Sequence, residues 1–305
     1  MILCAGEALI DMLPRESAQG EPSFAPYPGG AVFNTAIALG RLGAEVGFFC
    51  PLSDDLFGAQ LRGSLDASNV DHSFSPAVDR PCTLAFVTLT NGQARYAFYD
   101  RGTALRDMPL SELPDLPDAI STLFFGGISL VGDPCGAGFE ALCARAGDRV
   151  VMLDPNIRPG FIRDEPAYRA RLATMVARAD IVKLSDEDLH WLMGGGDIAA
   201  LAQALRAQGP QIVVITEGAK GARAFTASGE THASATPVDV VDTVGAGDTF
   251  NAGFLAGLAR AGALSKAGIA ALTGAVLQDA LALGTKAAAV TVSRAGANPP
   301  WAREI

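Results

Sequence analysis

"QIVVIT" (residues 211–216) is one of several short apolar runs that alternate with helix-length segments along the 305 residues of this chain. "RVVMLD" (149–154) and "DIVKL" (180–184) precede it, and "STLFFGGISL" (121–130) and "ILCAGEALI" (2–10) extend the series toward the N-terminus. Runs without a polar face suit strands that are buried on both sides, as in a parallel sheet covered by helices. The alternation therefore predicts an α/β fold whose ligands bind beyond the carboxyl ends of the strands.

The composition favours a small-molecule ligand over a nucleic acid or a membrane. Lys and Arg total 23 against 33 Asp and Glu, which gives a formal net charge of -10. Phosphate backbones and anionic lipid surfaces repel such a chain, and the sequence contains no basic run. With 49% hydrophobic residues, the chain is able to bury a large core. We therefore expect no nucleic-acid partner and no membrane partner.

Cysteines and histidines give no sign of a metal centre or a catalytic triad. The five cysteines are scattered, odd in number and outside any CxxC spacing, so we interpret them as reduced core thiols. The chain has only three histidines, which gives few candidates for a metal site or a Ser/His/Asp triad. The N-terminus lacks the basic region of a signal peptide, and no apolar run reaches the roughly 20 residues of a spanning helix. A cytoplasmic location is the default expectation.

Two segments break the alternation of strands and helices. "MLPRESAQGEPSFAPYPGG" (12–30) is rich in Pro and Gly, and residues 82–107 contain an Asn91-Gly92 hairpin signal between β-prone arms. We expect insertions at about 12–28 and 82–108 to form a small β lid over the strand ends, where closure excludes water. Two ordinary surface excursions are the alternative. No linker divides the chain, so residues 1–305 are expected to form a single domain.

"DTVGAGDTFNAGFLAGLAR" (242–260) places small residues and carboxylates ahead of a helical apolar pattern. Phe250, Phe254 and Leu258 recur at helical spacing, so a helix is expected to begin near Gly247. Free amides at a helix start favour a negative charge, and glycines let a ligand approach the backbone. Asp248 stands beside this anion cradle and could accept a proton from an attacking hydroxyl. The pattern indicates phosphoryl transfer, and a glycine loop followed by a capping Asp is the plainer alternative.

Two stretches of the chain resemble the signatures of one family. "DTVGAGDTF" (242–250) is similar to the C-terminal DTxGAGD signature of the ribokinase-like, or PfkB, carbohydrate kinases, and "PGGAVFNTAIALGRLGAEVGF" (28–48) is similar to their N-terminal signature. The resemblance covers essentially the whole chain, including the tail "VTVSRAGANPPW" (290–301). It implies a ribokinase-like three-layer αβα sandwich with a mostly parallel central sheet and a small β lid. The implied activity is transfer of the γ-phosphate of ATP to a sugar hydroxyl.

The resemblance implies roles for the residues on the sugar side of the site. Asp248 would be the catalytic base, and the amides of Gly245, Ala246 and Gly247 would form the anion hole. A loose phosphoryl-transfer transition state gathers charge on the transferred oxygens, so positioned donors suit it. Arg158 in "DPNIRP" would lie near the substrate and the transferred phosphate. The other implied sugar contacts are Asp11, Gly29, Gly30, Asn34 and Tyr99, the last of which has lid packing as its alternative role.

On the nucleotide side the resemblance is looser. "VITEGAKGARAF" (214–225) is similar to the strand and turn that line the ATP site. The family's NxxE element, which is tied to Mg²⁺, appears in altered form as Ser185-Asp186-Glu187-Asp188. Mg²⁺ would then be held mostly by ATP phosphates and water, as this ion generally prefers. Lys183 is expected to contact phosphate or, alternatively, to lie at the surface. The implied nucleotide contacts are Lys183, Ser185, Asp188, Thr216, Gly218, Gly221, Gly245 and Gly247.

The resemblance also implies a monovalent cation, K⁺, beside the anion hole. Backbone carbonyls would be its main ligands, so the side chains at these positions carry little information, and only Asp242 is specific. The corresponding positions are Asp242, Val244, Thr291, Arg294 and Gly296.

Within the family, several stretches look most like bacterial fructokinases. They include "GEALIDMLP" (6–14) and "IVKLSDEDLHWL" (181–192), and they favour D-fructose phosphorylated on O6. A 2-keto-3-deoxygluconate kinase would need a cationic lid contact for the substrate carboxylate, which Arg95, Arg101 or Arg106 could provide. That enzyme, or a ribokinase-type kinase, is the alternative.

An alternative of a different class is a pseudo-kinase that senses a sugar or a nucleotide without turnover. The intact Asp248 and the GAG sequence before it argue against this alternative. A homodimer is expected, because lid strands of the family often pair between subunits and an exposed sheet edge invites pairing.

Overall fold

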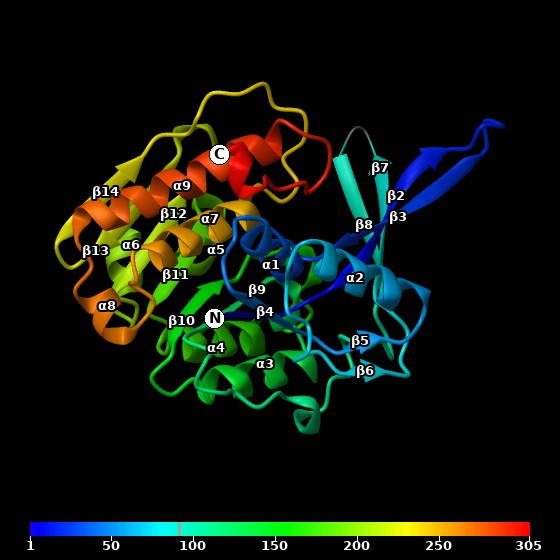
Figure 1. The fold of residues 1–305 in the computed structure, drawn as a ribbon, viewed down its shortest axis with the longest axis horizontal. Helices are drawn as coiled ribbons and strands as arrows, with labels where there is room; N and C mark the ends of the chain where they lie inside the picture. The colour runs from blue at the N-terminus through cyan, green and yellow to red at the C-terminus, as the bar shows by residue number, and fades with distance from the viewer. Residues whose placement is uncertain (91–92) are drawn as a thin grey trace.

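An eight-stranded sheet forms the centre of the molecule (Figure 1). The computed structural model describes residues 1–90 and 93–305, so the predicted Asn91-Gly92 turn lies outside the described residues. The sheet is parallel except at one edge, where two antiparallel strands are added. In spatial order the strands are β14 (Gly229–Ala233), β13 (Ala222–Thr226), β12 (Ile212–Thr216), β11 (Ile181–Ser185), β10 (Val150–Asp154), β9 (Thr122–Gly126), β1 (Ile2–Ala5) and β4 (Val46–Phe49).

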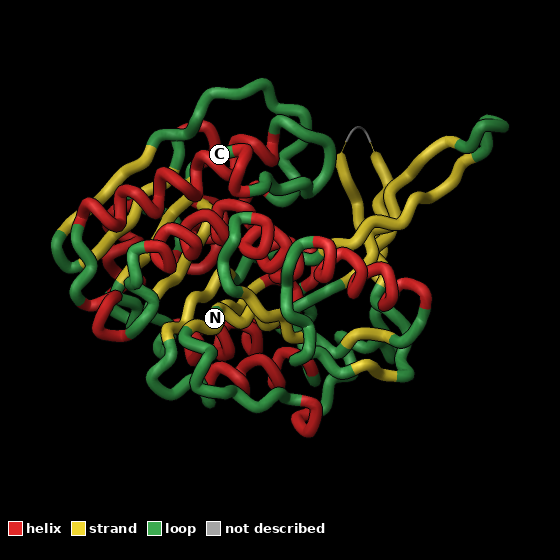
Figure 2. Tube along the Cα trace, in the orientation of Figure 1, coloured by secondary structure: helices red, strands yellow, loops and turns green. Residues whose placement is uncertain are grey.

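Helices cover both faces of this sheet (Figure 1, Figure 2). On one face α1 packs on β1, β4 and β9, while α9 packs on β13 and β14, and α7 lies between these two helices. On the other face α3 packs on β9, and α5 and α6 pack on β11, β12 and β13. The helices are α1 (Ala31–Arg41), α2 (Leu56–Ala67), α3 (Cys135–Ala144), α4 (Glu165–Val176), α5 (Asp186–Met193), α6 (Ile198–Arg206), α7 (Ala246–Arg260), α8 (Lys266–Ala270) and α9 (Gly274–Val292).

The central strands are apolar because both of their faces are covered. Every residue of β1, β9 and β10 is buried, which is the burial that their unbroken apolar runs predict. The predicted α/β fold with a mostly parallel sheet is therefore confirmed. β1 lies between β4 and β9, so the order of the strands reverses there, and open parallel sheets bind ligands beyond the strand ends at such a reversal.

A separate four-stranded sheet forms the lid. Its order is β3-β2-β7-β8, and the β2–β3 hairpin projects from the body of the molecule (Figure 1, Figure 2). The lid contacts the body through Phe98 and Phe161, whose ring centroids lie 4.6 Å apart. A two-stranded sheet of β5 (Leu52–Ser53) and β6 (Ala77–Val78) packs on α2 through β5. The lid strands are β2 (Leu9–Glu16), β3 (Pro22–Gly29), β7 (Leu84–Thr90) and β8 (Gln93–Tyr99).

α9 is the one helix among the described residues that is long and apolar enough, by length and composition alone, to cross a membrane. The sequence analysis identified no apolar run of spanning length, and this 19-residue helix contains the charged residues Asp279 and Lys286. In the structure α9 packs along α7, and about half of its residues face the interior. All five cysteines are buried and free, which agrees with their interpretation as core thiols.

Candidate active site

The first turn of α7 forms a backbone cradle. The helix begins at Ala246, one residue before the predicted start, and Gly245 precedes it with a left-handed φ of 77°. A Cβ on Gly245 would lie 2.7 Å from the Cβ of Ala297, so glycine is required there. The Ala246 amide donates to the Thr243 carbonyl over a long 3.3 Å. The amides of the first turn have no acceptor earlier in the helix, and with the helix dipole they favour an anion.

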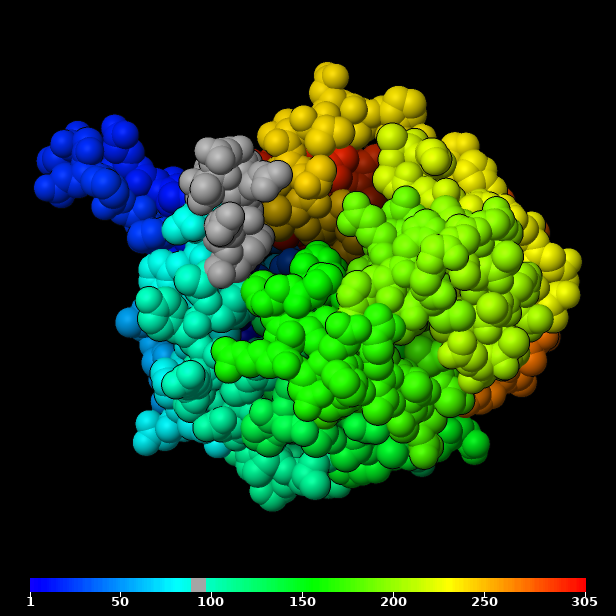
Figure 3. Space-filling view, turned by 180° about the vertical axis from the view of Figure 1, so that it is seen from behind, coloured from blue at the N-terminus to red at the C-terminus, as the bar shows by residue number. Residues whose placement is uncertain are grey.

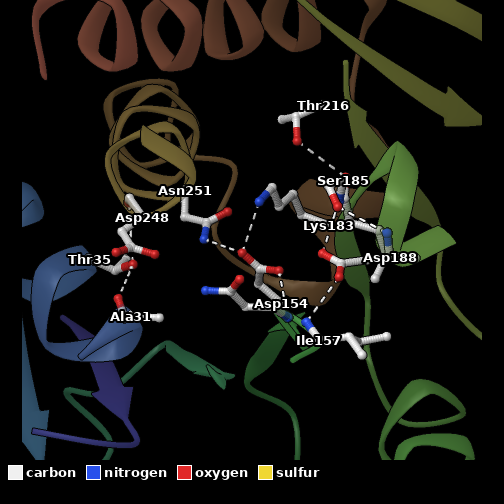
Figure 4. A network of polar contacts seen from close by, with 12 residues as sticks. Ala31, Thr35, Asp154, Ile157, Lys183, Ser185, Asp188, Thr216, Asp248 and Asn251 are labelled. Carbon is white, nitrogen blue, oxygen red and sulfur yellow. Dashed lines mark hydrogen bonds and ion pairs between the residues drawn. The ribbon is translucent and has the colours of Figure 1, made fainter. Parts of the chain in front are cut away.

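Asp248 lies in the same turn and is almost completely buried, at 7% exposure. Asn34 Nδ2 of α1 donates to Asp248 Oδ2 over 2.9 Å. The Thr35 hydroxyl lies 3.3 Å from the Asp248 carbonyl, and Figure 4 shows these two residues facing each other. Burial raises the pKa of Asp248 to about 7, and the charge of Asp154 acts in the same direction, whereas the Asn34 hydrogen bond opposes the rise. A carboxyl group that titrates near neutrality suits a general base.

The predicted sugar contacts lie near the junction of the lid with α1: Asp11, Gly29, Gly30 and Asn34. A Cβ on Gly29 would collide with Asp11 Oδ2, so the missing side chain makes room for this carboxylate. Burial raises the pKa of Asp11 to about 6. β3 runs through Gly29 and Gly30 into α1, and Asn34 in the first turn of α1 reaches Asp248. The structure thus brings the sugar-side residues of β2, β3 and α1 toward the predicted base.

Glu7, which the sequence reasoning missed, stabilises the junction between the lid and α1 from the side of β1. Its carboxylate is 1% exposed and accepts hydrogen bonds from the amides of Ala31 (2.9 Å) and Ser129 (3.2 Å). Gly30 has a φ of 113°, and a Cβ on it would lie 2.7 Å from the Glu7 carbonyl oxygen. A Cβ on Gly127 would collide with the Glu7 carboxylate. Glu7 therefore ties the end of β1 to the start of α1 and to the turn after β9.

Lys183 and Asp154 form a buried ion pair beside the cradle (Figure 4). Lys183 Nζ lies 3.0 Å from Asp154 Oδ2, and Asn251 Nδ2 donates to the same oxygen over 2.7 Å. Asn251 stands on α7 one turn after Asp248, and its Oδ1 is buried with no hydrogen-bond partner among the described residues. A Cβ on Gly247 would lie 3.1 Å from Lys183 Nζ, so the ammonium group lies directly against the cradle. Lys183 is thus a buried cation and not a surface residue.

Ser185 and Asp188 form a capping box at the start of α5. The Asp188 amide donates to Ser185 Oγ over 3.0 Å, and Asp188 Oδ2 accepts from the Ser185 amide over 3.4 Å. Asp188 Oδ1 accepts from the Ile157 amide, which fixes the loop after β10 (Figure 4). Burial and the neighbouring charge of Asp154 raise the pKa of Asp188. Among the described residues, no group of three or more His, Cys, Asp or Glu side chains could hold a metal ion.

A cavity of about 490 Å³ adjoins the cradle. The predicted nucleotide residues Thr216, Gly218 and Gly221 line it together with Ala246 and Gly247. None of the described residues that line it is charged. The cavity therefore suits a flat heteroaromatic group whose charged substituent reaches the cradle. Much of its apolar wall consists of Val238, Val240, Phe250, Ala288, Ala289 and Val292.

Four of the residues predicted for K⁺ lie on the loops before α7 and after α9, which Asp242 joins, and Thr291 lies at the end of α9. Asp242 Oδ1 accepts from the Val244 amide over 3.0 Å, and Oδ2 accepts from the Gly296 amide over 2.9 Å. The Thr291 hydroxyl donates to Thr249 Oγ1 on α7 over 3.0 Å. Arg294 pairs with Glu304 of the tail. The carboxylate of Asp242 thus holds both loops together beside the cradle.

A second cavity, of about 190 Å³, lies between the lid and the body. Arg163 lines this cavity, whereas Arg158 is exposed and donates to the carbonyl of Ile157. Tyr99 is 64% exposed, packs edge-on against Phe86 and does not line the cavity. Figure 3 shows the surface hollowed where the lid, the green segment after β10 and the gold segment before α7 face one another. The roles implied for Arg158 and Tyr99 stay predictions.

With this geometry in place, comparisons with known proteins identify the family. Residues 1–303 match the family described as pfkB family carbohydrate kinase. The chain belongs to this family. A fructokinase of Rhizobium leguminosarum bv. trifolii is 54% identical over 280 residues, which are 92% of this chain and 86% of that protein. The protein is thus a carbohydrate kinase with its acid, cradle and cavities assembled at one edge of the sheet.

Two solved structures resemble this carbohydrate kinase over nearly its whole length. A fructokinase of Xylella fastidiosa with bound ATP superimposes with a TM-score of 0.87 at 28% identity, covering 97% of this chain and 93% of its own. A double mutant of the Vibrio cholerae O395 fructokinase, in its fructose, ADP and potassium ion bound form, gives a TM-score of 0.85 at 26% identity, with coverages of 97% and 93%. The ribokinase-like fold implied by the sequence resemblance is confirmed.

Three buried polar residues of the site escaped the sequence reasoning: Glu7, Asp154 and Asn251. Glu7 follows β1 by two residues, and Asp154 is the last residue of β10, so both carboxylates stand at carboxyl ends of parallel strands. That position was the available signal, because ligand sites gather there. Asn251 lies three residues after Asp248, which places the two side chains on the same face of α7.

Proposed function

We propose that this kinase transfers the γ-phosphate of ATP to O6 of D-fructose, giving fructose 6-phosphate and ADP. The observation that carries the proposal is the position of Asp248, which is buried beside the α7 cradle and is hydrogen-bonded to Asn34 from the sugar side. The Rhizobium relative named fructokinase, at 54% identity, supports the choice of sugar. The fructose and ADP of the Vibrio cholerae structure support the pair of substrates.

In the proposed reaction Asp248 accepts the proton of the O6 hydroxyl while this oxygen forms a bond to the γ-phosphorus. The bond from the γ-phosphorus to the bridging oxygen breaks, and its electron pair leaves with ADP. The amides of Gly245, Ala246 and Gly247 and the ammonium group of Lys183 stabilise the charge on the transferred oxygens. Asp11, Gly29, Gly30 and Asn34 hold the sugar, and the cavity of about 490 Å³ holds the base of the nucleotide.

Mg²⁺ is expected to arrive on the nucleotide. Asp188 uses both carboxylate oxygens to bind the amides of Ile157 and Ser185. Asp154 Oδ2 binds Lys183 and Asn251, and its Oδ1 accepts from the Asn156 amide. These carboxylates therefore do not offer a direct magnesium site, and an ion held by ATP phosphates and water fits them better.

K⁺ is proposed to bind between the two loops that Asp242 joins, at the carbonyls of residues 242, 244, 291, 294 and 296. The potassium ion of the Vibrio cholerae fructokinase structure supports this site. Replacing K⁺ by tetramethylammonium at constant ionic strength should lower both kcat and the melting temperature. Asp242→Ala should remove the difference in melting temperature between the two salts, and a difference that persisted in this variant would place K⁺ elsewhere.

An ADP-release assay over a panel of sugars tests the proposed function. With saturating MgATP, kcat/KM should be highest for D-fructose, intermediate for D-ribose, and lowest for 2-keto-3-deoxygluconate. ³¹P NMR of the product should show the phosphate on O6. A higher kcat/KM for either competitor would favour the corresponding family alternative. Sugar and nucleotide binding without ADP release would instead favour the pseudo-kinase.

We also propose that residues 1–305 form one kinase domain that assembles as a cytoplasmic homodimer through the lid. β3 and β8 are the outer strands of the lid sheet, and Phe24 (42%), Tyr27 (43%) and Tyr99 (64%) are exposed on them. Unpaired strand edges beside exposed aromatic rings favour pairing with a second copy. Five free thiols agree with a reducing compartment.

A further inference from the structure

The cavity of about 190 Å³ adjoins the residues proposed to hold the sugar. Thr83 lines it, and the Thr83 carbonyl accepts from the amide of Ile10, the residue before Asp11 on β2. Ile128 lines it from the body, immediately after Gly127, which packs on the Glu7 carboxylate behind the Gly29–Gly30 turn. The cavity therefore borders the elements that carry Asp11 and the Gly29–Gly30 turn.

Two charged lid residues form one wall of the cavity. Asp100 and Arg106 both line it, and Arg106 Nη2 lies 3.2 Å from Asp100 Oδ2. Their side chains are 21% and 23% exposed, so the pair is largely shielded from water. Arg106 Nη1 also donates to the carbonyl of Gly132 over 3.2 Å. The guanidinium group thus already has a counter-ion and a carbonyl acceptor.

The turn that carries this pair is fixed to the base of the lid. The Thr103 hydroxyl donates to the carbonyl of Asp100 over 3.0 Å, and the Arg106 amide donates to Thr103 Oγ1 over 3.3 Å. The hydroxyl of Thr83, the residue before β7, donates to Thr103 Oγ1 over 2.8 Å. The positions of Asp100 and Arg106 are therefore set before a ligand arrives, which is what a selecting group requires.

We propose that Asp100 selects neutral sugars over sugar acids, with Arg106 as its counter-ion; this inference rests on the proposed sugar-kinase function. Asp100 neutralises Arg106, which would otherwise attract the carboxylate of a sugar acid, and as a hydrogen-bond acceptor it suits the hydroxyls of a neutral sugar. Among the lid arginines whose side chains the structure describes, Arg106 lines the cavity, and its charge is already paired with Asp100. Arg163, the other cation among the described residues that line the cavity, is exposed, so water screens its attraction for an anion.

The test compares two variants that remove the same charge from the same loop. Asp100→Asn removes the carboxylate inside the cavity, whereas Asp107→Asn removes an exposed carboxylate that does not line it. For the wild type and both variants, kcat/KM is measured with D-fructose and with 2-keto-3-deoxygluconate at saturating MgATP. The ratio of kcat/KM for the sugar acid to that for fructose should rise about ten-fold or more in Asp100→Asn, because Arg106 then has no counter-ion in the cavity and attracts the substrate carboxylate. The ratio should stay at the wild-type value in Asp107→Asn.

The outcomes separate this inference from the proposed function. A wild type that prefers fructose, together with an unchanged ratio in Asp100→Asn, would overturn the selection by Asp100 and leave the proposed function standing. An equal rise in both variants would also overturn it, because the effect would then be a general one of net charge. A wild type that prefers the sugar acid would overturn the proposed substrate and this inference together. A circular dichroism melt of each variant confirms that the ratios refer to folded protein.

Discussion

Asp248 is the residue that sets the expected pH dependence of the kinase. Burial raises its pKa from an ordinary value of 3.8 to about 7, and the base must be ionised to accept a proton. We therefore predict that kcat/KM falls as the pH drops below about 7. Asn34 stabilises the ionised form, so Asn34→Ala should move this acidic limb to higher pH. A loss of kcat/KM only near pH 4 in the wild type would contradict the assignment of Asp248 as the base. An unchanged pH profile in Asn34→Ala would contradict it as well.

At the same scale, Glu7 is predicted to hold the sugar-side junction together. Glu7→Ala would leave the buried amides of Ala31 and Ser129 without their acceptor, which costs about 1–3 kcal/mol for each unpaired group. Glu7→Gln keeps one side-chain oxygen and should lose less. Urea unfolding at pH 7 measures both free energies of unfolding. If Glu7→Ala were as stable as the wild type, the carboxylate would have no such role.

Among the elements, the pair α7 and α9 positions the cradle through close contact at glycines. A Cβ on Gly257 of α7 would lie 2.7 Å from the Cα of Ala280 on α9, so Gly257→Val should lower the free energy of unfolding by about 1–3 kcal/mol. The matched control is Gly63 in α2, where a Cβ would meet no atom within 4 Å. Gly63→Ala should raise the stability by roughly 0.5–1 kcal/mol, because glycine weakens a helix interior. Thermal melts measure both variants, and melting temperatures that shifted in the same direction would contradict this packing.

Individual strands and helices could be predicted because the apolar pattern and the turn residues of each segment indicate the same structure. β9 and β10 are buried throughout and apolar except for Thr122 and Asp154 at their ends, and α7 begins within a residue of the place that its glycines and apolar spacing predict. The packing of α9 against α7 was harder to predict, because two charged residues interrupt the apolar pattern of α9. Such packing depends on the partner helix, which the pattern of one segment does not contain.

At the scale of the whole molecule, the site joins residues that are far apart in the chain. Asn34 and Asp248 are 214 positions apart and share a hydrogen bond, and Asn251 meets Asp154 across 97 positions. The two signature stretches indicated the first pair through family resemblance. The second pair has no local pattern, because a buried Asp–Lys–Asn cluster is created only when β10, β11 and α7 come together. Sequence reasoning therefore named Asp248, the cradle and Lys183, whose roles stay predictions, but missed Asp154 and Asn251 beside them.

The proposed homodimer is also a property of the whole molecule. The lid edges and the exposed Phe24 and Tyr99 predict that light scattering after size exclusion gives twice the chain mass of 31.4 kDa. Replacing both aromatic residues by Ser should shift the mass toward the monomer, because an exposed apolar contact is lost. The matched control replaces the exposed Leu110, which lies outside the lid sheet, by Ser and should leave the mass unchanged. A wild-type mass of one chain would contradict the dimer.

The kinase mechanism is tested most directly by Asp248→Asn, which keeps the size of the side chain and removes the base. Turnover of D-fructose at saturating MgATP, measured by ADP release, should fall about 10²–10⁴-fold. Fructose binding, measured by calorimetry on the same preparation, should stay within a few-fold of the wild type. A variant that binds fructose and retains a kcat near the wild-type value would contradict the account, because another group would then be taking the proton.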